Sequence, residues 1–277
     1  MKKQILSFVM ALAFASDINA QETIQTSGSC AKTNTNGTCE WSFDTLTNTL
    51  RITGSGKMES YSSNPPWFAY QDQIKEITIE DGITSIGNRA FYAASNLETV
   101  NIPNSVEQIG DWAFCRTQNL KEIKLPNNPN FTTIPDYAFS HSGLTSIDIP
   151  QNVTSIGDWA FSGCKNLTNI LISDNVNFID HGAFNALPQD VNVYCRQGTN
   201  KHNGKTCDEL IDDHSLFTGK STTYQTDDNG FLMIRQKKYA SFKDFVEGNY
   251  IKKRIYTIEE AAAVSKPTGN TFKIRYK

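Results

Sequence analysis

A ladder of Ala-Phe pairs runs through the middle of this 277-residue chain. Successive pairs are 23, 25, 22 and 23 residues apart, and an isoleucine stands four residues before each pair. A fixed period of roughly 20–50 residues is typical of a solenoid, in which one small unit is stacked repeatedly. We therefore expect a β-rich solenoid of about five turns, each 22–25 residues long. The pairs are Ala90-Phe91, Ala113-Phe114, Ala138-Phe139, Ala160-Phe161 and Ala183-Phe184.

The fourth turn shows how one unit is expected to fold. Leu144, Ile147 and Ile149 predict a short strand with inward side chains, and a proline then ends it because proline cannot donate to a ladder. Val153 and Ile156 are expected to bury a second edge, while the phenylalanine fills the middle. One turn cannot bury its own apolar face, so each turn depends on its neighbours. The turns begin at Ile74, Leu97, Leu120, Leu144 and Leu167.

The segment before the repeats is expected to form an N-terminal cap over residues 21–73. Residues 39–43 alternate as a strand does and residues 50–54 return, which predicts a β-hairpin. A solenoid exposes the apolar face of its first turn unless a cap covers it. We expect the hairpin, with Trp67 and Phe68, to lie over the first repeat, and the repeats to occupy residues 74–195.

The segment after the repeats changes in character twice. Residues 196–230 are polar and rich in turn residues, which predicts a C-terminal cap or linker. Residues 231–277 carry 11 Lys or Arg and 4 Asp or Glu, a net charge of +7. Residues 21–230 carry 13 Lys or Arg and 24 Asp or Glu, a net charge of −11. This basic module either docks on the acidic part of the chain or lies on an anionic cell envelope. Its expected elements are strands over 231–234, 254–256 and 271–276 and a short helix over 261–265.

The first 20 residues have the features of a secretory signal peptide. A basic start precedes an apolar run over residues 5–15, and small residues suit cleavage after Ala20 or after Ala15. The run is too short to span a bilayer, which needs about 20 apolar residues, and no later stretch is long enough. We therefore expect a secreted or cell-surface protein without a transmembrane segment.

Export makes the cysteines candidates for disulfides. Cys30 and Cys39 flank a turn, so a bridge between them would close a small hairpin. Cys164 falls three residues after a repeat phenylalanine and is expected in the core as a small hydrophobe. Cys115 has no obvious partner.

The last two cysteines admit two interpretations. Cys195 and Cys207, with His202 and His214, are zinc ligands by residue type, but their spacing lacks the close pairs typical of structural zinc sites. A Cys195–Cys207 disulfide that closes the end of the repeats is therefore favoured, and no metal or other cofactor is expected.

Catalytic motifs are not convincing. The segment from Gly198 to Thr206 ends in Gly-Lys-Thr, but five residues separate its glycines where a phosphate-binding loop needs four. The four histidines are scattered and form no grouping with serine and aspartate. We therefore expect no enzyme, and an enzymatic site within residues 196–230 is the alternative. A net charge of −3 also argues against a nucleic-acid partner.

The repeat resembles the BspA-type leucine-rich repeat, which is also found in treponemal surface proteins. The shared pattern is Leu-x-x-Ile-x-Ile-Pro, then Val-x-x-Ile-Gly, then Ala-Phe-x-x-Cys, and it covers roughly residues 74–190. The chain departs from it in turn three, which has two extra residues near Asn128-Pro129 and ends early at Ser142-Gly143. The solenoid is expected to be irregular there. The resemblance implies a secreted or cell-surface protein for binding or adhesion.

Residues that flank the middle anchor of each strand are expected to point outward on a concave strand face. Such a sheet is a natural platform for a protein or glycan, or else a solvated surface. The set is polar and lacks aromatic rings. It comprises Glu76, Thr78, Thr99, Asn101, Glu122, Lys124, Ser146, Asp148, Asn169 and Leu171.

A second candidate site is the row of residues that precede the Ala-Phe pairs, namely Arg89, Trp112, Tyr137 and Trp159. Three stacked aromatic rings either bind a sugar or a partner, or pack on adjoining turns.

These features favour a secreted or cell-surface leucine-rich-repeat protein that binds a protein or glycan without catalysis. The alternative is a structural spacer or matrix component that its basic module, residues 231–277, attaches to the envelope.

Overall fold

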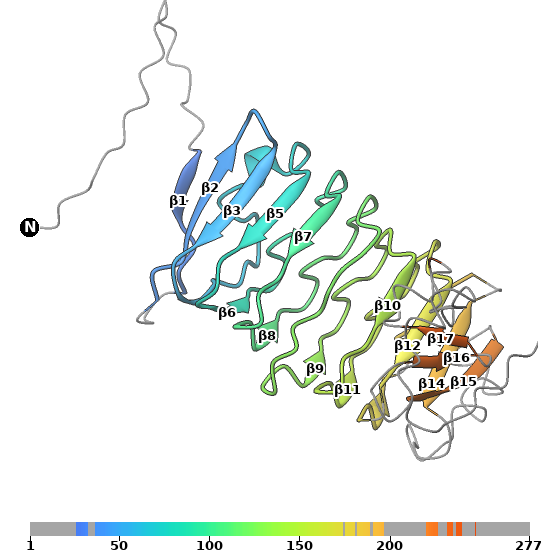
Figure 1. Ribbon diagram of the computed structural model, residues 1–277. Helices are drawn as coiled ribbons and strands as arrows, with labels where there is room; N and C mark the ends of the chain where they lie inside the picture. The colour runs from blue at the N-terminus through green and yellow to red at the C-terminus, as the bar shows by residue number, and fades with distance from the viewer. Residues whose placement is uncertain are drawn as a thin grey trace, which may run out of the picture.

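The computed structural model describes residues 26–32, 37–173, 175–180, 182–188, 191–196, 220–226, 232–234, 237–239 and 247. In these residues the chain forms a solenoid whose turns follow one another along one axis from β3 to β14 (Figure 1). The expected signal peptide, Cys207, and the helix and two strands expected after residue 250 lie outside the described residues.

Short strands line two sides of the solenoid, and most pair in parallel with the strand one turn away. The strand face carries a five-stranded and a six-stranded sheet, and the second edge carries two three-stranded sheets. The strand face contains β1 (Ser27–Ser29), β2 (Glu40–Asp44), β3 (Thr49–Thr53), β5 (Glu76–Ile79), β7 (Thr99–Asn101), β10 (Ser146–Asp148), β12 (Asn169–Ile172), β14 (Asn192–Arg196), β15 (Lys220–Thr226), β16 (Leu232–Ile234) and β17 (Lys237–Tyr239). The second edge contains β4 (Gly56–Lys57), β6 (Ile83–Ile86), β8 (Gln108–Ile109), β9 (Thr133–Ile134), β11 (Ser155–Ile156) and β13 (Phe178–Ile179).

The repeat phenylalanines form one column along the centre of the solenoid. From Phe91 to Phe184, neighbouring ring centroids lie 5.3, 5.6, 5.4 and 5.3 Å apart. Each of the five residues is at most 2% exposed. The predicted register of these rings is confirmed, and burial of each should contribute roughly 1.5–3 kcal/mol.

The solenoid begins one turn earlier than the Ala-Phe ladder indicates. β3 pairs in parallel with β5, and β4 with β6, so residues 49–73 form a turn of their own. Trp67 takes the place of phenylalanine in this turn, because its ring lies 5.7 Å from that of Phe91 and is 1% exposed. Trp67 and the five phenylalanines thus mark six turns rather than about five.

The cap satisfies backbone carbonyls of the first Ala-Phe turn. The Trp67 indole N–H donates to the Ala90 carbonyl at 3.0 Å, and the Gln71 side-chain amide donates to the Tyr92 carbonyl at 3.0 Å. In later turns, backbone N–H groups of the preceding turn donate to the equivalent carbonyls. A tryptophan at position 67 therefore continues both the ring column and the hydrogen bonding of the repeats.

The prediction that Phe68 also covers the first repeat is wrong. Phe68 is 47% exposed and begins a short 3-10 helix, η1 (Phe68–Tyr70). Tyr70, at the end of this helix, turns inward and stacks on Phe43 of the hairpin with ring centroids 4.4 Å apart. The helix places residues 67 and 70 on one side, since three residues make one turn of it.

A third row of hydrogen bonds joins the turns at the Ala-Phe segments. The N–H groups of Phe91, Phe114, Phe139 and Phe161 each donate to the alanine carbonyl of the next turn, at 2.8–2.9 Å. The residue before each of the first four Ala-Phe pairs has a φ of 54–61°, although none is glycine. This left-handed conformation costs roughly 1–2 kcal/mol per residue. It is tolerated because it directs that residue's own N–H to the next turn, as Arg89 N–H to the Asp111 carbonyl at 2.9 Å.

The turn that begins at Leu120 is called turn three because it is the third turn of the Ala-Phe ladder. It interrupts both rows of strands, as its two extra residues predict. No residue from Leu120 to Phe131 lies in a strand, so β7 and β10 stand on either side of a gap in the strand face. On the second edge, β8 and β9 belong to different sheets. The third row of hydrogen bonds and the ring column continue through the gap, since Phe114 N–H donates to the Ala138 carbonyl at 2.8 Å.

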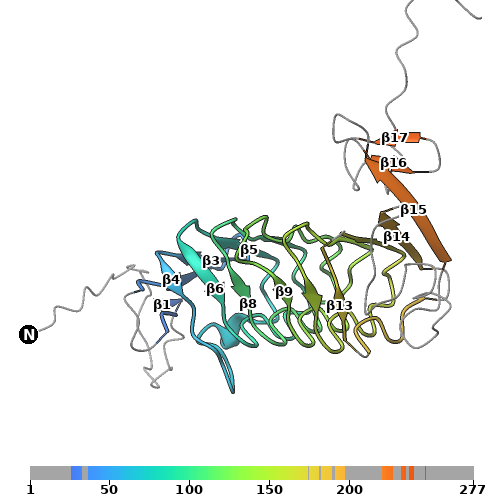
Figure 2. The same ribbon diagram turned by 90° about the horizontal axis from the view of Figure 1, so that it is seen from below.

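The C-terminal strands extend the strand face. β14 pairs in parallel with β15, which lies in the segment expected to be a polar cap or linker. β16 and β17 follow in antiparallel pairing and confirm the strand expected over 231–234. Figure 2 shows β15 leading away from the end of the solenoid, with β16 and β17 raised above the strand face. The described residues include no helix that could cross a membrane.

The structure confirms the expected Cys30–Cys39 disulfide and the core position of Cys164, while the Cys195–Cys207 pairing stays a prediction. Cys30 and Cys39 form a disulfide in the cap. Cys195 is disulfide-bonded, whereas its expected partner lies outside the described residues. Cys164 is buried in the core, and Cys115 is a buried free thiol.

Burial raises the pKa of both the Cys115 and the Cys164 thiol from 9.0 to about 11. We expect neither thiol to react with a disulfide reagent in the native protein at pH 8, and both to react in guanidinium chloride. Above pH 9 the unfolded chain loses thiol protons that the folded chain keeps, so the free energy of unfolding should fall between pH 9 and pH 11. Replacement of both cysteines by alanine should reduce that fall. Rapid labelling of the native protein would contradict the burial.

Candidate functional site

The predicted strand-face residues form two parallel rows on the outside of the sheet. Glu76 pairs with Thr99 in one row, and Thr78 pairs with Asn101 in the other. The rows resume beyond turn three, where Ser146 pairs with Asn169 and Asp148 with Leu171. Nine of the ten residues reach the surface, but Leu171 is only 6% exposed. Leu171 is therefore not available as a contact residue of this face.

The gap at turn three forms a hollow in the strand face. Its volume is about 710 Å³, within the usual range of roughly 300–1,000 Å³ for ligand sites. Its floor includes Val100 and Ile123, which are half-buried here, whereas the equivalent Ile77 and Ile147 are at most 1% exposed. The strand ladder is interrupted at turn three, and the apolar anchor residues there are half-buried, whereas the equivalent residues of other turns are buried. The predicted residues in its lining are Thr99, Glu122, Lys124, Ser146 and Asp148.

Charges of both signs surround this floor. Lys121 and Lys124 lie in the turn-three segment itself, and Glu98 stands beside β7. The pKa of the Asp148 carboxyl is raised to about 6, because surrounding protein atoms displace part of its hydration even though the residue remains exposed. The hollow therefore combines an apolar floor with a mixed, titratable rim, which suits a partner that carries both apolar and polar groups.

The aromatic row is a closed stack. The Trp112 and Tyr137 rings lie 4.0 Å apart with an interplanar angle of 7°, and the Tyr137 and Trp159 rings lie 6.2 Å apart at 4°. The Arg89 guanidinium lies 5.7 Å from the centroid of the Trp112 ring. At the other end, a Cβ on Gly182 would lie 3.0 Å from the Trp159 indole, so glycine there allows close packing. Ligand contact by this row stays a prediction, and all three rings are half-buried.

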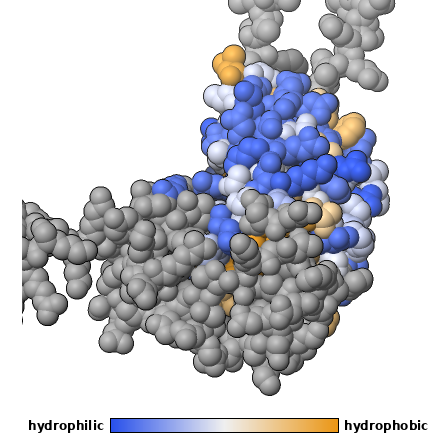
Figure 3. Space-filling model, turned by 90° about the vertical axis from the view of Figure 1, so that its right-hand side faces the viewer, coloured by the Kyte–Doolittle hydropathy of each residue, from blue (hydrophilic) through white to orange (hydrophobic). Residues whose placement is uncertain are grey.

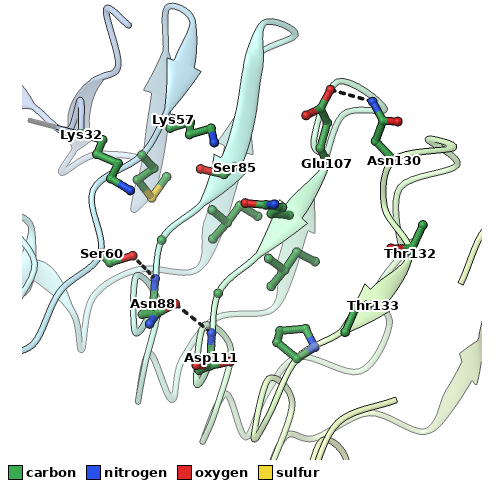
Figure 4. A pocket seen from close by; sticks show the side chains of 17 residues that line it. Lys32, Lys57, Ser60, Ser85, Asn88, Glu107, Asp111, Asn130, Thr132 and Thr133 are labelled. Atoms are coloured by element: carbon green, nitrogen blue, oxygen red, sulfur yellow. Dashed lines mark hydrogen bonds between the residues drawn. The ribbon is translucent and has the colours of Figure 1, made fainter. Parts of the chain in front are cut away.

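A second hollow, of about 330 Å³, lies on the second edge between β6, β8 and β9 (Figure 4). Several of its polar groups join neighbouring turns. Ser60 accepts from Asn88 N–H at 3.1 Å, the Asn88 side chain accepts from Asp111 N–H at 3.0 Å, and Asn130 donates to Glu107 at 3.0 Å. Several polar groups of this hollow are therefore engaged within the protein.

Two further hollows, of about 320 and 410 Å³, lie on the described surface, and Arg89 and Trp112 line the larger one. Viewed from the C-terminal side, the described surface that is visible is largely hydrophilic, with hydrophobic residues scattered singly (Figure 3). Within the described residues, no group of three or more His, Cys, Asp or Glu side chains could hold a metal ion.

The comparison with protein families agrees with this geometry. Residues 64–189 match the model of the BspA type leucine rich repeat region, in six copies. This chain carries BspA-type leucine-rich repeats. The matched region begins just before Trp67, so the BspA-type repeats include the turn that the Ala-Phe ladder does not mark.

Three solved structures of leucine-rich repeat proteins are similar to this chain, and only the first reaches a TM-score of 0.50. A leucine-rich repeat protein from Eubacterium ventriosum has 23% identity and a TM-score of 0.50, over 71% of this chain and 46% of its own. The T. pallidum leucine rich repeat protein has 23% identity and a TM-score of 0.41, over 56% and 67% of the two chains. A leucine rich cell surface protein from Faecalibacterium prausnitzii has 23% identity and a TM-score of 0.44, over 72% and 57%. This chain spans about half the length of the first, and no curated protein matches it.

Sequence reasoning identified the rim of the turn-three hollow but missed its floor. Val100 and Ile123 occupy anchor positions, which the repeat pattern assigns to the core. The 25-residue spacing between Phe114 and Phe139 was the feature that could have located the opening, because extra residues in one turn disturb its register with both neighbours.

Proposed function

We propose that this chain is a secreted or cell-surface protein that binds an extracellular protein or glycan through its strand face, and that it acts by binding rather than by catalysis. The observation that carries this proposal is the turn-three hollow, in which five predicted strand-face residues surround an apolar floor. Ligand sites are typically concave and apolar with a few polar groups at the rim. The predicted signal peptide supports export.

A paired set of variants tests this proposal. Full-length protein is applied to a glycan array and to a panel of immobilised extracellular-matrix proteins. The double substitution Lys124→Ala and Asp148→Ala should weaken any binding about tenfold or more, because it removes one cation and one anion from the rim. Binding should be measured by surface plasmon resonance.

The matched control is the double substitution Lys57→Ala and Glu107→Ala, which also removes one cation and one anion, but from the second-edge hollow. This control should bind as the unaltered protein does. If the control loses binding and the strand-face variant keeps it, the working surface is the second edge and the proposal fails. The alternative of an envelope-attached spacer stays a prediction, since most of residues 231–277 lie outside the described residues.

A further inference from the structure

We propose that the partner at the turn-three hollow is an extended polypeptide segment, which pairs with the open edge of β7 and places an apolar side chain on Val100 and Ile123. This inference rests on the proposed function and narrows its partner from a protein or glycan to a peptide chain.

The open edge of β7 supplies main-chain groups for such pairing. In a parallel ladder, the N–H and C=O of one residue point to the same neighbouring strand, and the next residue points the other way. Thr99 N–H donates to the Lys75 carbonyl at 3.2 Å, toward β5. The N–H and C=O of Val100 therefore point toward turn three. Across residues 98–150, all of which the structure describes, neither group has a backbone partner.

The edge of β10 faces the same gap from the other side. Ile149 N–H donates to the Leu171 carbonyl at 2.9 Å, toward β12, so the main-chain groups of Asp148 point toward turn three. β10 pairs only with β12 among the described strands. Two strand edges thus meet one hollow, and the turn-three segment between them bonds to β10 at one point, where Thr145 N–H donates to the Lys121 carbonyl at 3.0 Å.

These features favour a polypeptide over a glycan. An extended peptide has alternating main-chain donors and acceptors that match a strand edge, and its side chains supply specificity through adjacent pockets. Val100 and Ile123 form an aliphatic floor suited to one apolar side chain. The hollow lacks an aromatic ring on which a sugar could stack. The repeats before and after turn three have continuous ladders and offer no such edge.

A peptide selection tests the inference on the full chain. Random short peptides on phage are selected against the immobilised protein, and an enriched peptide is synthesised and its Kd is measured by fluorescence anisotropy. We expect a Val, Ile or Leu at the centre of the enriched sequences. Thr99→Arg should weaken binding about tenfold or more, because the new side chain fills the hollow. Thr133→Arg, the same change on the second edge of turn three, should leave the Kd unchanged.

N-methylation of the peptide distinguishes main-chain pairing from side-chain contact alone. Two versions of the peptide are compared, one N-methylated at its odd-numbered residues and one at its even-numbered residues. One version should lose binding and the other should keep it, because only every second residue of an added strand faces the edge. Equal binding of both versions would overturn the inference. If no peptide is enriched but a glycan binds in a manner that Lys124→Ala and Asp148→Ala abolish, the proposed function stands and the peptide inference fails. If neither peptides, glycans nor matrix proteins bind at the strand face, both fail.

Discussion

Replacement of Phe139 by alanine should lower the free energy of unfolding by about 3–5 kcal/mol. Phe139 is 0% exposed and stacks between Phe114 and Phe161, at 5.6 and 5.4 Å. The substitution removes a ring from the middle of the column and leaves a cavity with rigid walls on both sides. The loss should be larger than elsewhere in the column, because the ring column carries more of the contact between turns where the strand ladders are broken. Urea denaturation followed by circular dichroism measures it.

Phe178→Ala is the matched control for this experiment. Phe178 lies on β13 and is 49% exposed, so its truncation should change the free energy of unfolding by no more than about 0.5 kcal/mol. Similar losses in the two variants would show that the column does not dominate the stability of the solenoid.

Trp67→Ala should be comparably damaging, with a loss of about 3–5 kcal/mol, because it removes the first ring of the column and a hydrogen bond together. Trp67→Phe separates the two effects. A phenylalanine keeps the stacking on Phe91 but leaves the buried Ala90 carbonyl without its donor, which should cost about 1–3 kcal/mol. The free energies of both variants should be measured under the same conditions.

Phe68→Ala supplies the control for the cap. Its side chain is 47% exposed, so a small effect is expected although the two residues are adjacent. If Trp67→Phe proves as stable as the unaltered protein, the indole hydrogen bond contributes nothing and the cap acts by stacking alone. If Phe68→Ala costs as much as Trp67→Ala, the assignment of Trp67 as the first ring is wrong.

The periodic part of the fold could be predicted because each turn buries apolar residues at the same positions of the repeat. The Ala-Phe ladder fixed the core residues, and the strand anchors followed from alternation. The first turn was missed because Trp67 replaces the Ala-Phe pair and belongs to a segment whose hairpin resembles a separate cap. β15 was missed because its residues, Lys220 to Thr226, are polar, and polarity alone favoured a loop.

The candidate site could be predicted only in part, for a related reason. Repeat register tells which side chains point outward, and it placed Thr99, Lys124 and Ser146 correctly on the strand face. Register cannot show where the wall of the solenoid opens, since that depends on hydrogen bonds between turns. It also placed Leu171 outward, and the structure buries that residue.

The stacked rings of Trp112, Tyr137 and Trp159 illustrate a limit of composition as a guide to function. Exposed aromatic residues suggest sugar binding when only the sequence is considered. In the structure the rings pack on adjoining turns, Arg89 lies over one end and Gly182 lies against the other, while ligand contact stays a prediction. Their stacking contributes to contact between turns in the region where β8 and β9 do not pair with each other.

Amide hydrogen exchange resolved by NMR tests most directly whether the strand ladder is open at turn three, where the hollow lies and where the proposed peptide would pair. Ile77, Val100 and Ile147 hold the same position in three turns, but only the N–H of Val100 faces the gap. We predict that the Val100 amide exchanges much faster than those of Ile77 and Ile147, and that the Asp148 amide exchanges faster than that of its pairing neighbour Leu171. Equal protection of all five amides would mean that the ladder is continuous through turn three, and would contradict the account.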